Sequence, residues 1–414
     1  MKEKIKNMLQ KTEKYTQTDM VYLTKNISWI GIGKVISSAA SLVLVYVFGN
    51  FVSANDYGTY QYIISIAGLL ATPTLSGMNT AITKAVAQGF DGTIKEGLRI
   101  KIKWGLLSAI GSIGAGAYYL IQGNQVLGLS FIGIAILLPF MDSFSIFASY
   151  VEGKKDFKKA TWYGSIISIV RVATLISIIL ITKNIILITV SYFAITTLVR
   201  GLILFFILKK ENLNDAIDQK AISYGKHLSF MKILSNGIVS LDNILLFQFL
   251  GATQLAVYSF AKAPITKISS MLTPISTLAY PKFAETSVEN LKQTLPKKLF
   301  LFLFLMIAIT IVYIIAAPFL FSIVLPEYMD SVIYSQIFAI SLIFLPQKIA
   351  VSALTAHHQK RALYIINIIN PIIRIVALIF LLPLFGIMGV IISFLLGLLF
   401  NGIASFYYFF KMKV

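Results

Sequence analysis

The sequence predicts an all-α integral membrane protein with twelve transmembrane helices in two six-helix lobes. Of its 414 residues, 57% are hydrophobic and 13% are charged. Apolar runs of about 20 residues, the length that a helix needs to cross the hydrocarbon core of a bilayer, recur along the chain. The polar segments between these runs leave no length for a separate soluble domain. Function must therefore reside within the helix bundle or at its two ends.

The apolar runs set the expected helix boundaries. In chain order the helices are expected at 27–49, 58–80, 104–122, 125–150, 162–182, 185–208, 227–250, 254–278, 299–325, 331–356, 363–383 and 386–410. The expected parts of the chain are a cytoplasmic tail at 1–26, an N-lobe at 27–208, a cytoplasmic linker at 209–226 and a C-lobe at 227–414. In the tail, Ile5, Met8 and Leu9 follow helical spacing among lysines, which is typical of an interfacial helix. A disordered tail is the alternative.

The basic residues set the orientation, because lysine and arginine near helix ends are retained on the cytoplasmic side. With the N-terminus inside, cytoplasmic segments hold 27 of the 36 lysines and arginines, and Lys183 alone faces outward. The net charge of +19 follows from this bias and from attraction to anionic lipid headgroups. We therefore expect both termini in the cytoplasm, and no nucleic-acid partner.

An internal repeat predicts the two lobes. A shift of 198 residues superposes Lys34 on Lys232. A shift of 203 residues superposes Arg171 on Arg374. Six helices return the chain to its starting side of the membrane, so the two units are parallel repeats related by a pseudo-two-fold axis along the membrane normal. Two lobes of this kind can rock about a central site.

Positive charge exceeds negative charge inside the expected helices, where Asp142 and Asp242 are the only acids. An ionisable residue costs about 2.5–3.5 kcal/mol at the centre of a membrane helix on insertion scales, so each is a candidate functional residue. The excess of cations favours an anionic substrate over a cationic drug or a metal ion. The basic residues are Lys34, Arg171, Arg200, Lys232, Lys262, Lys267, Lys348 and Arg374.

The leading helix of each half carries a lysine followed by polar residues at helical spacing. Lys34, Ser37 and Ser41 share one side of the first helix. Lys232 and Ser235 occupy the equivalent positions on the seventh helix. Two such lysines, facing each other across the pseudo-axis, can bind a diphosphate as paired point charges. The alternative is that both lysines snorkel to the inner membrane surface.

The eighth helix contains Lys262 and Lys267 together with Pro264 and Pro274. Broken helices at membrane depth are tolerated where they line a cavity or are buried in protein. Five residues of an ideal helix rotate the two lysines by about 140°, so both reach one cavity only if the helix kinks or the cavity is broad. A purely structural kink is the alternative.

Arg171 and Arg374 lie near the middle of the fifth and eleventh helices. A guanidinium can bind phosphate through two parallel hydrogen bonds, or it can pair with Asp142 or Asp242 in a structural role. Because a membrane carboxyl group can alternate between protonated and ionised forms, Asp242 is the first candidate for ion coupling and Asp142 the second. A fixed ion pair with a lysine of the seventh or eighth helix is the alternative role for Asp242.

Signatures of catalysis and of metal binding are missing from the sequence. Gly31, Gly33 and Lys34 lie in a membrane helix and lack the spacing of a phosphate-binding loop. His357 and His358 have no nearby carboxylate, and the absence of cysteine excludes thiolate metal sites. We expect no metal site and no cofactor. The outer turns are short and nearly uncharged, which argues against a membrane polymerase or ligase.

Three short stretches resemble motifs of a known family. They are the turn at 51–60, the turn at 249–259 and the loop at 150–158. As a set they resemble the Wzx-type polysaccharide flippases, within the superfamily that includes multidrug and toxin extrusion (MATE) transporters. Ala256 stands where that family often has glycine, and Asp242 is similar to an acid often found at the end of the seventh helix. The resemblance spans the chain and implies a MATE-like fold.

The resemblance implies transport of undecaprenyl-diphosphate-linked oligosaccharide units, of the O-antigen or capsule kind, across a bacterial plasma membrane by alternating access. The diphosphate and sugars would sit in a cationic cavity while the prenyl tail stays in lipid. The expected partners are this glycan, membrane lipids and other polysaccharide-assembly proteins. The expected substrate-binding residues are Lys34, Lys232, Lys262, Lys267, Arg171 and Arg374. The alternatives are a drug exporter coupled to Na⁺ or H⁺, and a membrane glycosyltransferase or polymerase.

Overall fold

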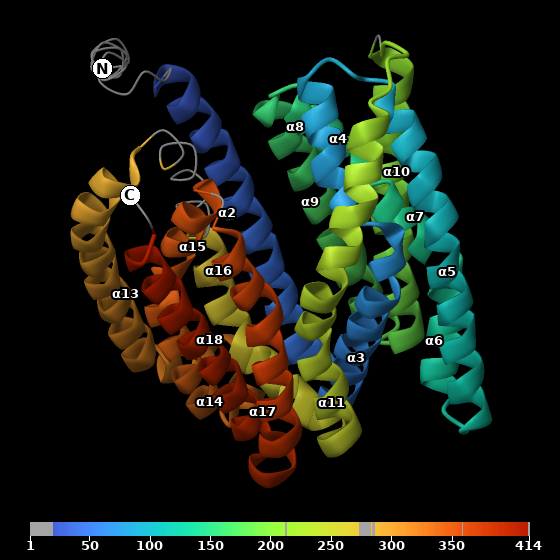
Figure 1. Ribbon diagram of the computed structural model, residues 1–414. Coiled ribbons are helices and arrows are strands. Elements are labelled where there is room, and N and C mark those ends of the chain that lie inside the picture. Colours follow the sequence, from blue (N-terminus) through green and yellow to red (C-terminus); the bar gives the residue numbers. More distant parts are fainter. Residues whose placement is uncertain (1–19, 212, 273–282, 284–285, 358, 413–414) are drawn as a thin grey trace, which may run out of the picture.

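The computed structural model describes residues 20–211, 213–272, 283, 286–357 and 359–412, and every regular element in these ranges is a helix. The first 19 residues of the expected N-terminal tail, and Pro274, lie outside the described residues. Helices α3 to α10 gather on one side of the molecule and α13 to α18 on the other (Figure 1). The two groups diverge towards the end at which the N-terminus lies and come together at the opposite end (Figure 1).

The helices follow one another with short connections. Their bounds are α2 Met20–Phe51, α3 Ala54–Leu70, η1 Thr72–Thr74, α4 Gly77–Ala87, α5 Thr93–Ile121, α6 Gln125–Ala135, α7 Leu138–Ser143, α8 Ile146–Gly153, α9 Phe157–Ile181, α10 Ile185–Lys210, α11 Gln219–Leu272, α13 Val288–Val324, η2 Pro326–Tyr328, α14 Ser331–Ala339, η3 Ile340–Phe344, α15 Gln347–Ala356, α16 Lys360–Tyr364, η4 Ile365–Ile369, α17 Asn370–Phe385 and α18 Ile387–Phe410.

Several helices begin at a polar side chain that caps their first turn. The side chains of Ser53, Asp156 and Ser287 accept hydrogen bonds from backbone N–H groups at the starts of α3, α9 and α13. Such caps satisfy N–H groups that have no partner inside the helix. Helices α9 and α13 start five and eleven residues before the apolar runs expected at 162 and 299, because a capped helix continues into polar sequence beyond the membrane core.

Among the described residues, nine helices are long and apolar enough to cross a membrane, or ten if α6 and the bent segment Leu138–Gly153 form one span. The expected number was twelve. Two parts of the chain account for the difference. The helices expected at 227–250 and 254–278 are the two parts of α11 on either side of a break at Gly251, whose backbone has φ 85° and ψ 177°, so α11 contributes two helices although it counts once among the nine. The helix expected at 58–80 is divided among α3, η1 and α4.

The first part of α11 packs along α3 and α4. A side chain at Gly58 of α3 would overlap the backbone carbonyl of Ala252, so glycine permits this close approach. Farther along, the Asn243 side-chain amide donates to the Ser65 hydroxyl at 2.8 Å. The expected C-lobe boundary at 227 stays a prediction, since the helix that follows it contacts both halves of the chain.

Aromatic side chains close the bundle at the end away from the N-terminus. The rings of Tyr57 in α3 and Phe260 in α11 stack with centroids 4.2 Å apart, and Tyr328 of η2 lies 4.2 Å from Phe260. Burial raises the pKa of Tyr328 to about 12, so its phenol is neutral in this packing. The Asn50 amide of α2 donates to the Val324 carbonyl of α13 at 2.9 Å. These contacts tie the first half of the chain to the second.

Candidate functional site

Asp242 of α11 is the centre of a buried charge cluster in the second half of the chain. Its side chain is 1% exposed, and its Oδ2 pairs with the guanidinium of Arg374 in α17. The same oxygen lies 3.6 Å from the Lys262 Nζ and accepts a hydrogen bond from the Tyr258 hydroxyl at 3.1 Å. The guanidinium and the ammonium also lie over the ring of Phe394 in α18. One acid is therefore shared between two cations.

Three polar atoms near this cluster have no hydrogen-bond partner among the described residues: Asp242 Oδ1, Arg374 Nε and Asn370 Oδ1. Asn370 and Arg374 share one face of α17, at i and i+4, and both approach Gly397 of α18. A buried polar group without a partner is costly, and a trapped water commonly satisfies such groups. The cluster thus offers polar atoms to which a water beside the ion pair would hydrogen-bond.

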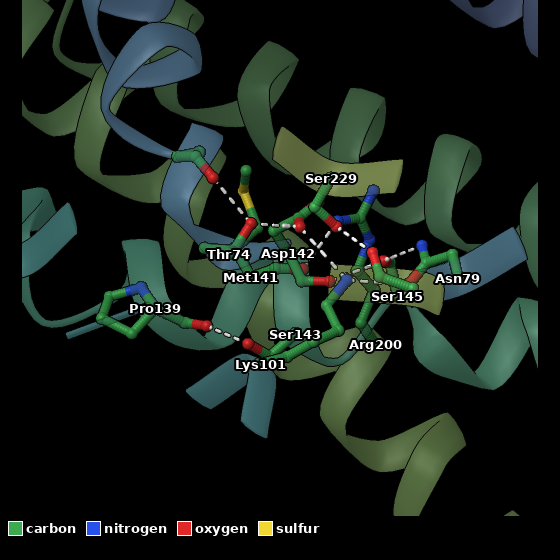
Figure 2. A network of polar contacts seen from close by, with 12 residues as sticks. Thr74, Asn79, Lys101, Pro139, Met141, Asp142, Ser143, Ser145, Arg200 and Ser229 are labelled. Atoms are coloured by element: carbon green, nitrogen blue, oxygen red, sulfur yellow. Dashed lines mark hydrogen bonds and ion pairs between the residues drawn. The ribbon is translucent and has the colours of Figure 1, made fainter. Parts of the chain in front are cut away.

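A second charge cluster surrounds Asp142 of α7 in the first half of the chain. The Lys101 side chain of α5 is 0% exposed, and its Nζ lies 3.3 Å from Asp142 Oδ2 and 2.8 Å from Asn79 Oδ1. The Thr74 hydroxyl donates to the same carboxylate at 2.5 Å. Figure 2 shows Thr74 and Lys101 converging on Asp142 from opposite sides.

The Asp142 cluster extends through backbone groups of its own segment. The Ser145 hydroxyl donates to the Asp142 carbonyl at 2.6 Å and accepts a hydrogen bond from the Asn79 amide at 3.2 Å. Arg200 of α10 donates to the Met141 carbonyl at 2.7 Å (Figure 2). Four helices and a helical turn thus meet around one carboxylate, which fits a role in holding the first half together.

A third set of charges contains cations only. Lys34 of α2 and Arg171 of α9 are each close enough to Lys267 of α11 for their charges to repel its ammonium, and α2 packs along α9. Among the described residues none of the three forms an ion pair with an acid. Lys34 is exposed and Lys267 is half-buried. We call Lys34, Arg171 and Lys267 the central cations.

Arg171 and Arg374 occupy equivalent positions in the internal repeat, so their surroundings can be compared directly. Arg171 lies 5.4 Å from the ring centroid of Tyr192, and Arg374 lies 4.9 Å from that of Phe394. Tyr192 and Phe394 are equivalent at a shift of 202 residues, so each arginine stacks on the same aromatic position. The shift of 198 places Leu44 at the Asp242 position. The first half therefore keeps the arginine and its aromatic support without the acid.

The structure brings the expected site residues into two separate groups. Lys262, Arg374 and Asp242 form one cluster, whereas Arg171, Lys34 and Lys267 form the other. Asp142, expected as a second coupling acid, pairs with Lys101. Lys232 lies within α11, but its side chain is outside the described part of the protein. Its expected position opposite Lys34 stays a prediction.

Lys101 and Tyr258 are polar members of these clusters that the sequence analysis did not identify. Lys101 was counted with the cytoplasmic loop, because the apolar run begins at Trp104. A signal was present in small residues at spacings of three and four along the same face of α5. This buried face contains Gly97, Lys101, Gly105, Ser108, Ser112 and Gly116. A lysine within such a stripe must face protein rather than water.

No group of three or more histidine, cysteine, aspartate or glutamate side chains able to hold a metal ion occurs in the described ranges. The acids that reach membrane depth, Asp142 and Asp242, are each occupied by basic side chains. The central cations can bind an anion, because they are positively charged and none of them forms an ion pair with an acid among the described residues.

The fold matches solved transporter structures. An inward-facing multidrug resistance MATE family transporter of the MOP superfamily aligns with a TM-score of 0.69 and 14% identity, over 93% of this chain and 97% of that chain. The outward-facing conformation of such a transporter aligns with a TM-score of 0.64 and 15% identity, over 94% and 95%. A MOP superfamily transporter from Pyrococcus furiosus, whose reversed binding-pocket polarity suggests a different function, gives the same values. These likenesses show a MATE-like fold.

The sequence itself also matches a family. No curated protein matches the chain. The family model described as polysaccharide biosynthesis protein matches residues 23–287, a range that includes Asp142, Asp242 and all three central cations. A multi-pass membrane architecture and the fold of a transporter agree with this match. The chain belongs to the polysaccharide biosynthesis protein family.

Proposed function

We propose that this protein is a flippase that moves undecaprenyl-diphosphate-linked oligosaccharide units across a bacterial plasma membrane by alternating access. The family match supports a role in polysaccharide biosynthesis, and the fold supports transport rather than catalysis. The proposal places both termini in the cytoplasm, in line with the positive-inside bias of the loops. It also places the site between an N-lobe and a C-lobe that rock against each other.

The central cations are the observation that carries this proposal. Lys34 and Arg171 each repel the Lys267 ammonium, and among the described residues no acid forms an ion pair with any of the three. A bound anion removes that cost, and a low dielectric strengthens the attraction. A diphosphate carries charge enough to engage more than one cation at once. Lys34 and Arg171 come from the first half and Lys267 from α11, so one anion can contact helices from both halves.

A drug exporter coupled to Na⁺ or H⁺ is the second candidate, because multidrug MATE transporters share the fold. Such an exporter needs free acids to attract a cationic drug. Here Asp142 and Asp242 each pair with a buried or half-buried basic residue. The balance of charge at the site therefore favours an anionic substrate.

The aromatic closure at one end supports an alternating-access cycle. Tyr57, Phe260 and Tyr328 join the halves at the end away from the N-terminus. The TM-score is higher for the inward-facing relative than for the outward-facing one. In our proposal the substrate headgroup enters from the cytoplasmic side, reaches the central cations and leaves after this closure opens. The prenyl tail remains in lipid throughout.

Deletion of the gene tests the proposed function. We expect untranslocated lipid-linked repeat units to accumulate and surface glycan to fall, and the wild-type chain to reverse both effects. Purified protein in vesicles should move a fluorescent lipid-linked oligosaccharide between leaflets. Normal surface glycan combined with increased drug sensitivity in the deletion strain would instead establish the exporter.

A further inference from the structure

A pocket on the side of the first half lies between α5 and the start of α11. It has a volume of about 340 Å³ and is lined by Ile100, Lys103, Trp104 and Leu107 of α5 and by Lys226 of α11. The four α5 residues fall at i, i+3, i+4 and i+7, so they form one face of that helix. Lys101 lies on a different face of α5, which is buried in the Asp142 cluster. The pocket is thus separate from both charge clusters of the candidate site.

The two lysines of this pocket stand at the membrane boundary. Lys103 directly precedes the apolar run expected at 104–122, and Lys226 directly precedes the run expected at 227–250. Neither lysine forms an ion pair with an acid among the described residues. With the spans beginning where the apolar runs begin, their ammonium groups are expected at headgroup depth, with their charge available to a ligand.

The remaining walls of the pocket are apolar and exposed. Trp104 is 37% exposed and Leu107 is 49% exposed. Phe230 of α11, which is 54% exposed, meets the Trp104 ring edge-to-face with centroids 6.1 Å apart. Tryptophan is enriched where hydrocarbon meets headgroups. The pocket therefore changes from cationic to apolar as it passes from Lys103 towards Leu107, that is, in the direction in which a phospholipid changes from phosphate to acyl chain.

We propose that this pocket binds an anionic phospholipid of the inner leaflet. The phosphate lies between the ammonium groups of Lys103 and Lys226, and an acyl chain runs along Trp104, Leu107 and Phe230. The bound lipid bridges α5 to α11, which leads from the inter-lobe linker into the second half. This linker is held to α5 by protein contacts as well, since the Asp218 N–H donates to the Thr93 hydroxyl at 3.0 Å. The lipid adds a second tie at the level of the membrane surface.

Native mass spectrometry of the full chain, purified in detergent and titrated with phosphatidylglycerol or phosphatidylcholine, tests this site. Wild-type protein should retain phosphatidylglycerol in preference to phosphatidylcholine. One basic residue near an anionic surface contributes on the order of a fivefold change in affinity, so Lys103→Gln and Lys226→Gln should each weaken phosphatidylglycerol binding about fivefold and the double variant roughly 25-fold. Lys103→Arg with Lys226→Arg should restore binding.

The matched control removes the same amount of charge elsewhere. Lys209 and Lys210 lie at the end of α10 over Phe205 and Phe206 of their own helix. Their double glutamine variant should bind phosphatidylglycerol as wild-type protein does. Equal loss in this control would show that overall charge attracts the lipid, and it would overturn the proposal. So would unchanged binding in the Lys103 and Lys226 variants; if the double variant does not fold, the two single variants decide.

The acyl chain has a separate test. Leu107→Gln leaves both lysines in place and should weaken phosphatidylglycerol binding, whereas glycerol phosphate without chains should bind far more weakly than the lipid. Glycerol phosphate bound as tightly as phosphatidylglycerol would make the pocket a site for free phosphate and overturn the assignment to a lipid. None of these measurements depends on transport, so their failure leaves the proposed flippase activity untouched.

Discussion

The guanidinium of Arg374 pairs with the carboxylate of Asp242, whereas its repeat counterpart Arg171 lies over Tyr192 and has no acidic partner among the described residues. The two arginines have the same kind of aromatic support, so the difference lies in the acid. Leu44 occupies the position in the first half that Asp242 occupies in the second. One copy of the repeat therefore neutralises its arginine internally, and the other keeps it available for an anion.

We predict that Lys267→Gln lowers transport without lowering the amount of folded protein. A hydrogen bond to a charged group contributes about 1.5–3 kcal/mol, so loss of one contact to phosphate should weaken substrate affinity about tenfold or more. Lys34→Gln, Lys232→Gln and Lys262→Gln should also lower transport. Arginine at each position should preserve more activity, because it keeps the charge.

The measurement is surface glycan in a complemented deletion strain, with protein level followed in parallel. Lys183→Gln is the control, because Lys183 lies in the turn between α9 and α10, outside both helices. Full complementation by all four glutamine variants would show that Lys34, Lys232, Lys262 and Lys267 do not handle the substrate.

We predict that Asp242→Asn destabilises the fold. Asp242 is 1% exposed and serves both Arg374 and Lys262, so its neutralisation leaves two cations without a counter-charge. Removal of one partner from a buried ion pair costs about 3–5 kcal/mol. Thermal unfolding of the purified protein should therefore show a clear fall in Tm. Arg374→Gln combined with Asp242→Asn should recover part of that loss, and a double variant whose effect equals the sum of the single ones would mean that the pair is not coupled.

We predict that Lys101→Gln also destabilises, because it leaves Asp142 and Asn79 without their buried donor. Asp142 is 31% exposed, so water compensates in part and a cost of about 1–3 kcal/mol is expected. Arg99→Gln is the control two residues away, since its side chain is 81% exposed. Equal Tm values for the two variants would show that the Asp142 cluster does not hold the first half together.

We predict that Gly58→Ala disrupts the contact between α3 and α11. An added methyl group would overlap the Ala252 carbonyl, and overpacking of this kind costs about 1–3 kcal/mol. Gly114→Ala is the matched control, because no atom lies within 4 Å of its added methyl group. That change should be neutral or slightly stabilising, since alanine favours helix. A Gly58→Ala protein as stable as the Gly114→Ala protein would place the two helices farther apart than the structure has them.

The order of the apolar runs predicts most of the fold, since a membrane span is a local property of about 20 residues. The breaks within spans are less visible. Residues 72–76 form η1 and a turn inside one apolar run. The break at Gly251 is different, because the expected helices end at 250 and begin at 254, and Asp242 contacts Tyr258 and Lys262 across the break. The break at 72–76 lies beside a close contact between distant helices, because Gly77 of α4 packs against the backbone of Leu228 and Ser229 in α11.

The sequence predicts which charged residues lie at the candidate site, but it does not predict which of them form ion pairs with one another. The scarcity of acids identifies Asp142 and Asp242, and the excess of cations predicts an anion. Which cation meets which acid depends on the rotation of each helix about its axis. Lys101 illustrates the point, because its burial follows from a stripe of small residues on α5 and not from its distance to the apolar run.

Our last prediction is that an ion gradient drives transport through Asp242, with Asp142 as the second candidate. Asp242 Oδ2 is held by Arg374, while Oδ1 is buried without a partner among the described residues. A substrate anion that draws Lys262 away would weaken the hold on this carboxylate, which would link substrate binding to the coupling acid. Wild-type protein in vesicles should therefore flip its substrate faster under an imposed proton gradient, with Na⁺ and voltage gradients applied as separate arms. Asp142→Asn should retain the gradient response if Asp242 alone is the coupling acid. Flipping at one rate under every gradient would eliminate coupling while leaving flippase activity intact, because the central cations bind an anion whatever drives the cycle.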